Sequence, residues 1–490
     1  MEKISLVECG FNLEWEKGRW YYNGSLSTHR CPNFKNVELL PENLTVVGKL
    51  DLSDTKITHL PKGLRVMDTL NLGKSSIKEL PADLYVAGHL GIAFADIVSI
   101  PATIRVDGII FLGKSISKLP DNLTIEDDLY LVDTSVSVLP KGLHVKGDLY
   151  ISALDIKELP DDLIVDGDYH LEGSSITALP DNMLVNGLLN IVNTKITSLP
   201  KNLKVKGTLD MQRTSIAYLP DDFVVGGSLH INDTLITALP NNLVVGHDLI
   251  CDRLPLTNVP DNLVVGGTLQ LTDTKLISLP DNLVVGRNLN ISFTPIKKLP
   301  KNLIVKDWLD ISYADVLPLP EDLVVGGKIY DFPKNARRKF FRNNIIPKTL
   351  LWHNGKYIKI DNMLVEVVSH RGNVYRARKL NDNAIFYLVT DGNGKWEHSN
   401  KLGEAKEGLI YKIDNNDVRQ YKYLYPNSKL NYIDVITCYR VITGASISST
   451  KHFVENRLKS CKRKYTIGEM AELSEGEYGN IAFKKFFNIE

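Results

Sequence analysis

The sequence is poor in cysteine, and its few cysteines follow no pattern. Among 490 residues there are five: Cys9, Cys31, Cys251, Cys438 and Cys461. An odd number without paired spacing argues against a disulfide framework, and the spacing of a zinc ribbon is absent. This usage is typical of a protein that works in a reducing compartment.

Long apolar runs are also missing. No stretch approaches the length of a membrane-spanning helix. The first eight residues, Met-Glu-Lys-Ile-Ser-Leu-Val-Glu, lack the charged and apolar regions of a secretory signal. We therefore expect a soluble protein without membrane contact. Its compartment is expected to be the cytoplasm, either of its own cell or, through a signal-less secretion route, of a host cell.

Prolines, in contrast, recur every twenty residues through the middle of the chain. The register is strict from Pro120 to Pro320, and the same step holds from Pro41 to Pro101 until one residue is lost before Pro120. A fixed period of this length indicates a solenoid, in which each unit contacts only its neighbours and the array presents a long, regular surface.

Within one repeat, residues 260–279, the apolar positions form two short stretches with the period-two spacing of strands. These positions are Leu263, Val265, Leu269, Leu271, Leu276 and Leu279. Pro260 with the following Asp-Asn marks one corner of the coil, and Gly266 and Gly267 mark a second. We therefore expect a mainly β protein, a β-solenoid of about fifteen 20-residue coils stacked about 4.8 Å apart.

A column of small hydroxyl residues recurs in the same frame. Its members are Thr134, Ser174, Thr194, Thr214, Thr234, Thr274 and Thr294. A hydroxyl at this place can bond backbone groups left unpaired at the turn, so we expect a structural ladder.

The frame Leu269-Gln-Leu271-Thr-Asp-Thr274-Lys-Leu276-Ile-Ser-Leu279-Pro280 resembles the twenty-residue bacterial class of leucine-rich repeat. That class occurs in secreted bacterial effectors, including ubiquitin-ligase effectors, and similar arrays occur in phage and mobile-element proteins. The resemblance covers roughly residues 40 to 330 and implies a protein-binding array. Threonine replaces the usual asparagine, and Val-Gly-Gly replaces the second Leu-Pro pair. The back of each coil is therefore expected to be a strand, nearer to a two-sided β-solenoid.

The effector ligases also carry a Cys-x-Asp nucleophile motif, which is absent here. The tail reads Cys438-Tyr-Arg440 and Cys461-Lys-Arg463. A thiol–imidazole pair could be built only with the tail histidines His353, His370, His398 and His452, and nothing in their spacing shows that they meet. We therefore predict no catalytic residues, no cofactor and no metal site.

Composition divides the chain into three parts. Residues 1–39 carry aromatic side chains such as Trp15 and Trp20 without the repeat frame, as an N-terminal cap requires. The solenoid is expected over residues 40–330, and a basic α+β domain over residues 331–490. From Asp331 onward there are 28 Lys and Arg against 17 Asp and Glu, a net charge of +11, and the preceding residues carry −11. The chain thus combines an acidic array with a basic domain.

In the C-terminal domain, period-two patterns predict four strands at residues 357–360, 363–368, 374–378 and 385–389. Asp391-Gly and Asn393-Gly predict a hairpin turn after them. Beyond this turn, short helices are expected at residues 401–413, 432–442, 450–460 and 467–473.

The best candidate contact surface in the array is an acidic and aromatic ladder. Residues flanking the inward column point outward and stack coil upon coil: Asp128, Asp148 and Asp168 beside Tyr130, Tyr150 and His170, with Glu172 one step further. Stacked carboxylates repel one another unless a cation or a basic partner relieves them. The alternative interpretation is that these carboxylates only keep an edge hydrated. A calcium site is not expected, since stacked strands splay ligands along a line.

Two basic segments are candidates for contact with nucleic acid or an acidic protein. The first holds Lys334, Arg337, Arg338, Lys339 and Arg342, and the second ends in Lys462, Arg463 and Lys464. Phosphate contact would make their binding strongly salt-dependent. The alternatives are a solvated helix face or docking on the chain's own acidic array.

These observations favour a non-enzymatic protein–protein interaction scaffold that holds a macromolecular partner along the solenoid. Two alternatives stay open. One is an effector-like enzyme whose solenoid selects substrate for chemistry in the C-terminal domain, and the other is nucleic-acid binding through that basic domain. The sequence leaves the partner and the oligomeric state open.

Overall fold

A computed structural model describes residues 5–316, 318–331, 347–392, 394–412, 418–445, 447–458 and 464–489. The chain forms two compact units, Met1–Ile346 and Pro347–Glu490. The division predicted between residues 330 and 331 stays a prediction, because the segment that follows lies outside the described residues.

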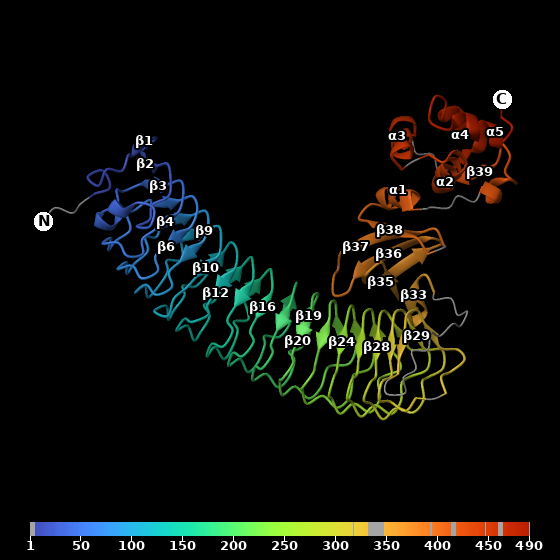
Figure 1. Cartoon of the computed structure of the whole chain (residues 1–490), viewed down its shortest axis with the longest axis horizontal. Helices are drawn as coiled ribbons and strands as arrows, with labels where there is room; N and C mark the ends of the chain where they lie inside the picture. Colours follow the sequence, from blue (N-terminus) through green and yellow to red (C-terminus); the bar gives the residue numbers. More distant parts are fainter. Residues whose placement is uncertain are drawn as a thin grey trace. The chain divides into compact units, whose positions relative to one another are not determined.

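The first unit is a solenoid whose front is a fifteen-stranded parallel sheet (Figure 1). Each front strand has two residues, and strands of consecutive coils pair in register, as Leu129 with Leu149. The strands are β4 (Leu50–Asp51), β6 (Leu70–Asn71), β8 (Leu90–Gly91), β10 (Ile110–Phe111), β12 (Leu129–Tyr130), β14 (Leu149–Tyr150), β16 (Tyr169–His170), β18 (Leu189–Asn190), β20 (Leu209–Asp210), β22 (Leu229–His230), β24 (Leu249–Ile250), β26 (Leu269–Gln270), β28 (Leu289–Asn290), β30 (Leu309–Asp310) and β32 (Ile329–Tyr330).

The back of each coil is also a short strand, so the two-sided β-solenoid expected from the Val-Gly-Gly stretch is confirmed. These strands pair in parallel with those of neighbouring coils in three successive sheets. They are β3 (Leu44–Val46), β5 (Arg65–Val66), β7 (Tyr85–Val86), β9 (Arg105–Val106), β11 (Thr124–Ile125), β13 (His144–Val145), β15 (Ile164–Val165), β17 (Leu184–Val185), β19 (Lys204–Val205), β21 (Val224–Val225), β23 (Val244–Val245), β25 (Val264–Val265), β27 (Val284–Val285), β29 (Ile304–Val305) and β31 (Val324–Val325).

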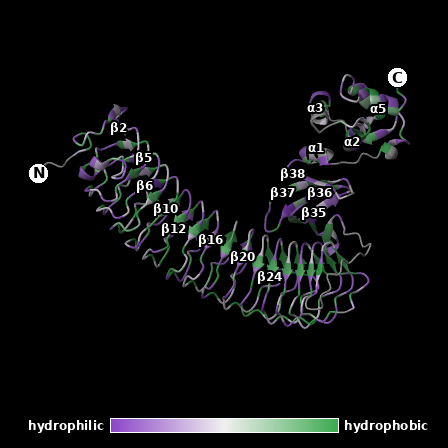
Figure 2. Cartoon of the chain, viewed as in Figure 1, coloured by the Kyte–Doolittle hydropathy of each residue, from purple (hydrophilic) through white to green (hydrophobic). Residues whose placement is uncertain are grey.

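The interior of the solenoid is one continuous apolar cluster that runs from Leu6 to Ile329. Figure 2 shows the hydrophobic residues recurring along the strands of each coil. The inward columns are almost fully buried, as at Leu149, Tyr169 and Leu189. Burial of these columns between coils supplies the hydrophobic stabilisation that a single coil lacks.

The Pro-Asp-Asn corner is explained by bonds between coils. The Asp after the proline accepts a hydrogen bond from a backbone N–H one coil later, as in Asp181 Oδ1 with Lys201 N at 2.9 Å. The following residue is left-handed, with φ of 61° at Asn182 and 55° at Asn202, and the two amides bond at 2.9 Å. Asn tolerates this conformation better than most residues, which accounts for its recurrence there.

The hydroxyl column is a structural ladder, as predicted. Each hydroxyl donates to the backbone carbonyl three residues earlier, at 2.6 to 2.9 Å: Thr134 to Leu131, Ser174 to Leu171, Thr194 to Ile191, Thr214 to Met211, Thr234 to Ile231, Thr274 to Leu271 and Thr294 to Ile291. The hydroxyl thus bonds a turn carbonyl within its own coil, and at Leu131, Leu171 and Ile191 that carbonyl also accepts the backbone N–H of the same Thr or Ser.

At the N-terminal end, the hairpin of β1 (Glu14–Glu16) and β2 (Arg19–Tyr22) continues the back sheet, because β2 pairs in parallel with β3. A 3-10 helix, η1 (Pro32–Asn36), places Phe34 in the core, where its ring meets Phe11 edge to face. The back sheet therefore extends beyond the first coil on its N-terminal side, where β2 covers the edge of β3.

The second unit contains a six-stranded antiparallel meander of β33 (Leu350–Trp352), β34 (Tyr357–Ile360), β35 (Met363–Arg371), β36 (Val374–Lys379), β37 (Ile385–Thr390) and β38 (Trp396–Ser399), with the short 3-10 turn η2 (His353–Gly355). The four predicted strands are present, and the Asp391 turn connects β37 to β38 as a hairpin. Helix α1 (Leu402–Lys412) packs on this sheet, where Leu409 and Ala405 meet Val389.

The remaining elements are η3 (Val418–Tyr421), β39 (Lys429–Asn431), α2 (Tyr432–Thr443), α3 (Ile447–Arg457), β40 (Lys464–Thr466), α4 (Ile467–Leu473) and α5 (Asn480–Phe486). Strands β39 and β40 pair antiparallel, and the helices share a core around Tyr439, Phe453 and Phe483. Three of the predicted helices are confirmed, and the fourth is shifted, because α3 covers Ile447–Arg457 where residues 450–460 were expected and residues 459–460 lie outside the described ones; the sequence missed α5.

Candidate functional site

The predicted acidic ladder has a structural function in addition to its charge. Each Asp accepts a hydrogen bond through Oδ1 from the backbone N–H one coil later. Asp128 bonds Asp148 N at 2.8 Å, Asp148 bonds Asp168 N at 2.8 Å, and Asp168 bonds Leu188 N at 2.7 Å. One oxygen of each carboxylate is thus held against the backbone, which offsets part of the expected repulsion.

Glycine in the corner follows from this bond. A Cβ built at Gly147, Gly167 or Gly187 would lie within 2.3 Å of the Oδ1 atom of the Asp in the preceding coil. No side chain fits there while the bond is made. At Gly187 the carboxylate alone obstructs a Cβ, whereas at Gly147 and Gly167 backbone atoms of the preceding coil also lie within 2.8 Å, so close approach, and not a special backbone angle, requires glycine at these corners.

Beside the carboxylates stands a row of parallel rings. Tyr130 and Tyr150 stack with centroids 4.1 Å apart and planes 6° apart, and Tyr150 and His170 stack at 4.3 Å and 3°. Phe111 extends the row, 5.0 Å from Tyr130, and its side chain is 42% exposed. The sequence reasoning missed Phe111 because its coil has nineteen residues. If the coil that ends at Pro120 is given nineteen residues instead of twenty, the sequence does align Phe111 with Tyr130, as the structure pairs them.

Glu172 lies two residues beyond His170, on the same side of the extended chain. Ser152, in the preceding coil, donates to its Oε1 at 2.6 Å. The other oxygen, Oε2, is buried and has no hydrogen-bond partner among the described residues. The structure therefore links six of the seven predicted surface residues by direct contacts, and Glu172 follows two residues after His170. We call these seven, together with Phe111, the acidic–aromatic patch.

The patch carries negative charge that no neighbouring Lys or Arg neutralises within the described residues. Burial raises the pKa of the Asp128 carboxyl, and the Asp148 charge adds to the rise, while the bond from the Asp148 amide opposes it. Burial, Tyr130 and the Asp148 carboxylate raise the pKa of the Tyr150 phenol. Within the described residues, ion pairs with Lys or Arg form elsewhere on the solenoid, as at Glu126 with Lys146, and not with the patch carboxylates.

Most of the predicted basic residues cannot be placed. Lys334, Arg337, Arg338, Lys339, Arg342, Lys462 and Arg463 lie outside the described residues, whereas Lys464 begins β40 and is exposed. The nucleic-acid interpretation therefore stays a prediction.

The candidate thiol of the enzymatic alternative is buried. Cys438 lies in α2 with no exposed surface, and burial, with a smaller contribution from Asp434, raises the pKa of its thiol. A buried, protonated thiol is a poor nucleophile. Cys461 lies outside the described residues.

In the part of the chain that the structure describes, no helix has the length and apolar character needed to cross a membrane.

The chain is a parallel β-solenoid of leucine-rich, twenty-residue coils followed by a small α+β unit. No family model and no curated protein matches it. Among solved structures it is similar to YopM, a leucine-rich effector protein from Yersinia pestis, with 16% identity and a TM-score of 0.35 over 58% of this chain and 88% of that chain. YopM from Yersinia enterocolitica WA-314 gives 16% identity and a TM-score of 0.25 over 63% and 91%. At these values neither likeness assigns a function.

Proposed function

We propose that this protein is a non-enzymatic scaffold that binds a protein partner on the front of its solenoid, centred on the acidic–aromatic patch. A long, regular and rigid array is suited to holding a macromolecule. Its partner contributes basic side chains, because the patch offers carboxylates without a cationic neighbour beside stacked rings. Lys and Arg are attracted to both groups. The proposed compartment is a cytoplasm, in accord with the free thiols.

The observation that carries the proposal is the position of the rings. In six of the other eleven coils the equivalent residue is an Asp or Asn whose side chain accepts the backbone N–H two residues later, and the remaining five coils carry Gly91, His230, Ile250, Gln270 and Tyr330 there. Six coils make this bond, through Asp51, Asn71, Asn190, Asp210, Asn290 and Asp310, at 2.9 to 3.3 Å. The four consecutive ring residues have no acceptor for it. The coil itself therefore favours Asn or Asp there, and the rings call for another explanation.

The carboxylate column supports the same conclusion. Elsewhere in this column the bond to the next coil is made by one further carboxylate, Asp248, and by neutral side chains, as by Thr208 to Ser228 N at 3.3 Å and by Asn288 to Trp308 N at 3.3 Å. The solenoid needs an acceptor at this place but not a charge. Three successive carboxylates exceed that need, and a basic partner gives them a function.

The test is affinity capture by the full chain from nuclease-treated extract of its native cell type, at low and high salt. Tyr150→Ala opens the ring row, and Asp148→Asn removes a charge while keeping the acceptor. Asp248→Asn is the matched control, because Asp248 makes the same bond, to Thr268 N at 2.6 Å, away from the rings.

We expect a defined protein to be retained by the wild type and the control, with retention reduced in both patch variants. Asp148→Asn should lower it most at low salt, where exposed charges are least screened. Equal capture by all four proteins would contradict binding at the patch, and capture that occurs only when the nuclease is omitted and is lost at high salt would indicate nucleic-acid binding instead.

A further inference from the structure

We infer that Asp148, Asp168 and His170 form a binding site for a divalent first-row transition-metal ion. The site lies within the acidic–aromatic patch and shares Asp148 and Asp168 with the proposed partner surface, but ion binding is measured on the protein alone and can therefore be tested without the partner. The three residues come from the adjacent strands β14 and β16 and their preceding corners. Together they supply one imidazole nitrogen and two carboxylates, a mixed ligand set that Zn²⁺ and other divalent first-row transition metals accept.

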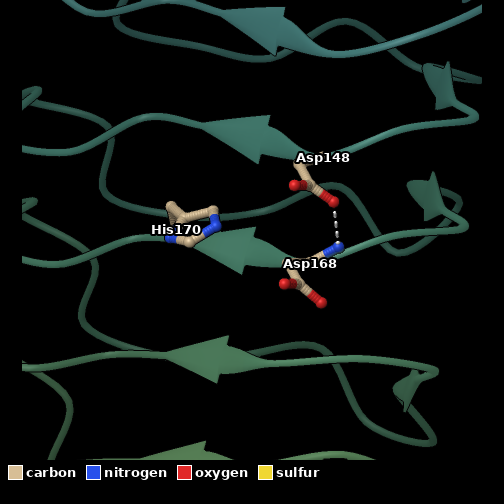
Figure 3. A group of neighbouring side chains, drawn as sticks. All are labelled: Asp148, Asp168 and His170. Atoms are coloured by element: carbon tan, nitrogen blue, oxygen red, sulfur yellow. Dashed lines mark hydrogen bonds between the residues drawn. The ribbon is translucent and has the colours of Figure 1, made fainter.

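The geometry converges on one space. A ligand atom from each residue, one ring nitrogen and one oxygen per carboxylate, lies within 4.8 Å of the other two. In Figure 3, Asp148 and Asp168 stack on consecutive coils, and the ring of His170 faces them from the side. Bonds of about 2.0–2.2 Å to an ion between them require these atoms to close by roughly 1 Å, which partly exposed side chains achieve by small rotations.

Each ligand is already oriented by a neighbour. The ring of His170 is fixed by its stacking on Tyr150, 4.3 Å and 3° away. Backbone N–H groups hold Oδ1 of Asp148 and of Asp168, and this leaves the two Oδ2 atoms for an ion. The Tyr150 hydroxyl lies 3.3 Å from Asp148 Oδ2 as a donor. Supporting hydrogen bonds and packing of this kind orient the ligands of metal sites.

A second observation concerns Glu172, which lies two residues from His170 along the chain and is not one of the three converging ligands. Glu172 carries a buried oxygen, Oε2, without a hydrogen-bond partner among the described residues. A buried, unsatisfied carboxylate oxygen is costly and often marks an ion or water that a structure does not contain. With Asp128 the local set holds four carboxylates, and within the described residues none has a Lys or Arg partner. A bound dication offsets this charge.

The ligand chemistry selects among ions. Calcium prefers six to eight oxygens around it, which a flat strand face does not supply. An imidazole nitrogen with two carboxylates suits Zn²⁺ or Co²⁺, with water at the remaining positions. From the sequence we expected ligands on stacked strands to lie along a line. His170 changes this arrangement, because its ring nitrogen approaches the two carboxylates from the side.

The test is a titration of the chelator-treated full chain with Zn²⁺ by calorimetry and with Co²⁺ by visible absorption. His170→Asn and Asp148→Asn remove one ligand each. Both place at the altered position a residue that the array already carries there, at Asn190 and Asn288, so the coil is expected to remain intact, which circular dichroism verifies. His230→Gln is the control, because His230 occupies the same column but meets a single carboxylate, Asp210, at 3.3 Å.

We expect saturable binding of one ion to the wild type and to the control, with affinity at least about tenfold lower in each ligand variant. The Co²⁺ spectrum should show nitrogen and oxygen ligation without a thiolate charge-transfer band. Absence of saturable binding, an affinity unchanged in His170→Asn, or a thiolate band that accounts for the binding would each overturn the inference.

Discussion

Replacing Gly187 by alanine tests the central structural claim, that carboxylates from one coil hold the backbone of the next. A Cβ at Gly187 would lie 1.8 Å from Oδ1 and 3.1 Å from Cγ of Asp168, both too close, whereas the nearest backbone atom, Gly167 O at 3.6 Å, is at ordinary contact distance. The Asp168 side chain must therefore rotate away, and its hydrogen bond to Leu188 N is lost.

The magnitude follows from that single bond. A hydrogen bond to a charged group contributes about 1.5–3 kcal/mol. Alanine also stabilises the folded state by about 0.4–1 kcal/mol, because it lowers the conformational entropy of the unfolded chain. We expect Gly187→Ala to lower the free energy of unfolding by about 1–2 kcal/mol. At Gly91 the nearest atom to a built Cβ is Asn71 Oδ1 at 3.6 Å, so Gly91→Ala should instead stabilise the protein by about 0.4–1 kcal/mol.

The assay is urea unfolding in the presence of chelator, combined with amide hydrogen exchange at Leu188, because solenoid coils can open locally. A double-mutant cycle isolates the contact. In an Asp168→Ala background the obstructing oxygen is gone, so Gly187→Ala should become stabilising, as at Gly91. If Gly187→Ala costs the same in both backgrounds, or if the Leu188 amide stays protected in the single variant, the reasoning is wrong.

Three further outcomes are expected. Thr214→Val should lower the free energy of unfolding by about 1 kcal/mol in urea melts, because the buried carbonyl of Met211 loses its hydroxyl donor; no change would contradict the ladder. Asp128 has a raised carboxyl pKa, so the folded state binds that proton more tightly than the unfolded chain, and its charge opposes folding as the pH rises above the usual aspartate range. The urea unfolding midpoint of Asp128→Asn, measured relative to that of the wild type, should therefore rise between about pH 3.5 and 7. A difference that does not change with pH would refute this. The Cys438 thiol, buried and with a raised pKa, should resist thiol reagents in the folded protein and react after unfolding, so fast labelling that disappears in Cys438→Ser would contradict its burial.

The sequence predicted the solenoid well because the physics of each coil is local and repeated. Pro260 with Asp-Asn, the double glycine and the period-two apolar positions each act within one coil or between identical neighbours. The twenty-residue period then places equivalent residues of consecutive coils side by side. The helices of the C-terminal unit were predicted for the same reason, since α2 and α4 are marked by local patterns and by caps at Asn431 and Thr466.

What the sequence did not predict depends on distances between coils. Column alignment put Asp148 beside Asp168, but not the approach of a carboxylate oxygen to the next backbone N–H. That approach is the reason for glycine at position 187, which from sequence indicated only a corner. Likewise the stacking of His170 on Tyr150, and with it the direction of the ring nitrogen, depends on side-chain rotamers, which spacing does not fix. Phe111 was missed because a single deleted residue shifts the frame by one, which exchanges inward and outward positions.

The contrast between columns also separates scaffold from surface. A side chain that bonds the backbone of its own or the next coil, such as Asn190 or Asp248, is explained by folding alone. The rings of Tyr130 and Tyr150 make no such backbone bond and are stabilised chiefly by each other, at about 0.5–1.5 kcal/mol per stacked pair. That gain is similar to the hydrogen bond that an Asn would make there, so folding has no strong preference for a ring. The proposed partner would supply the preference, and the ring row is therefore the place on this array where binding is to be sought first.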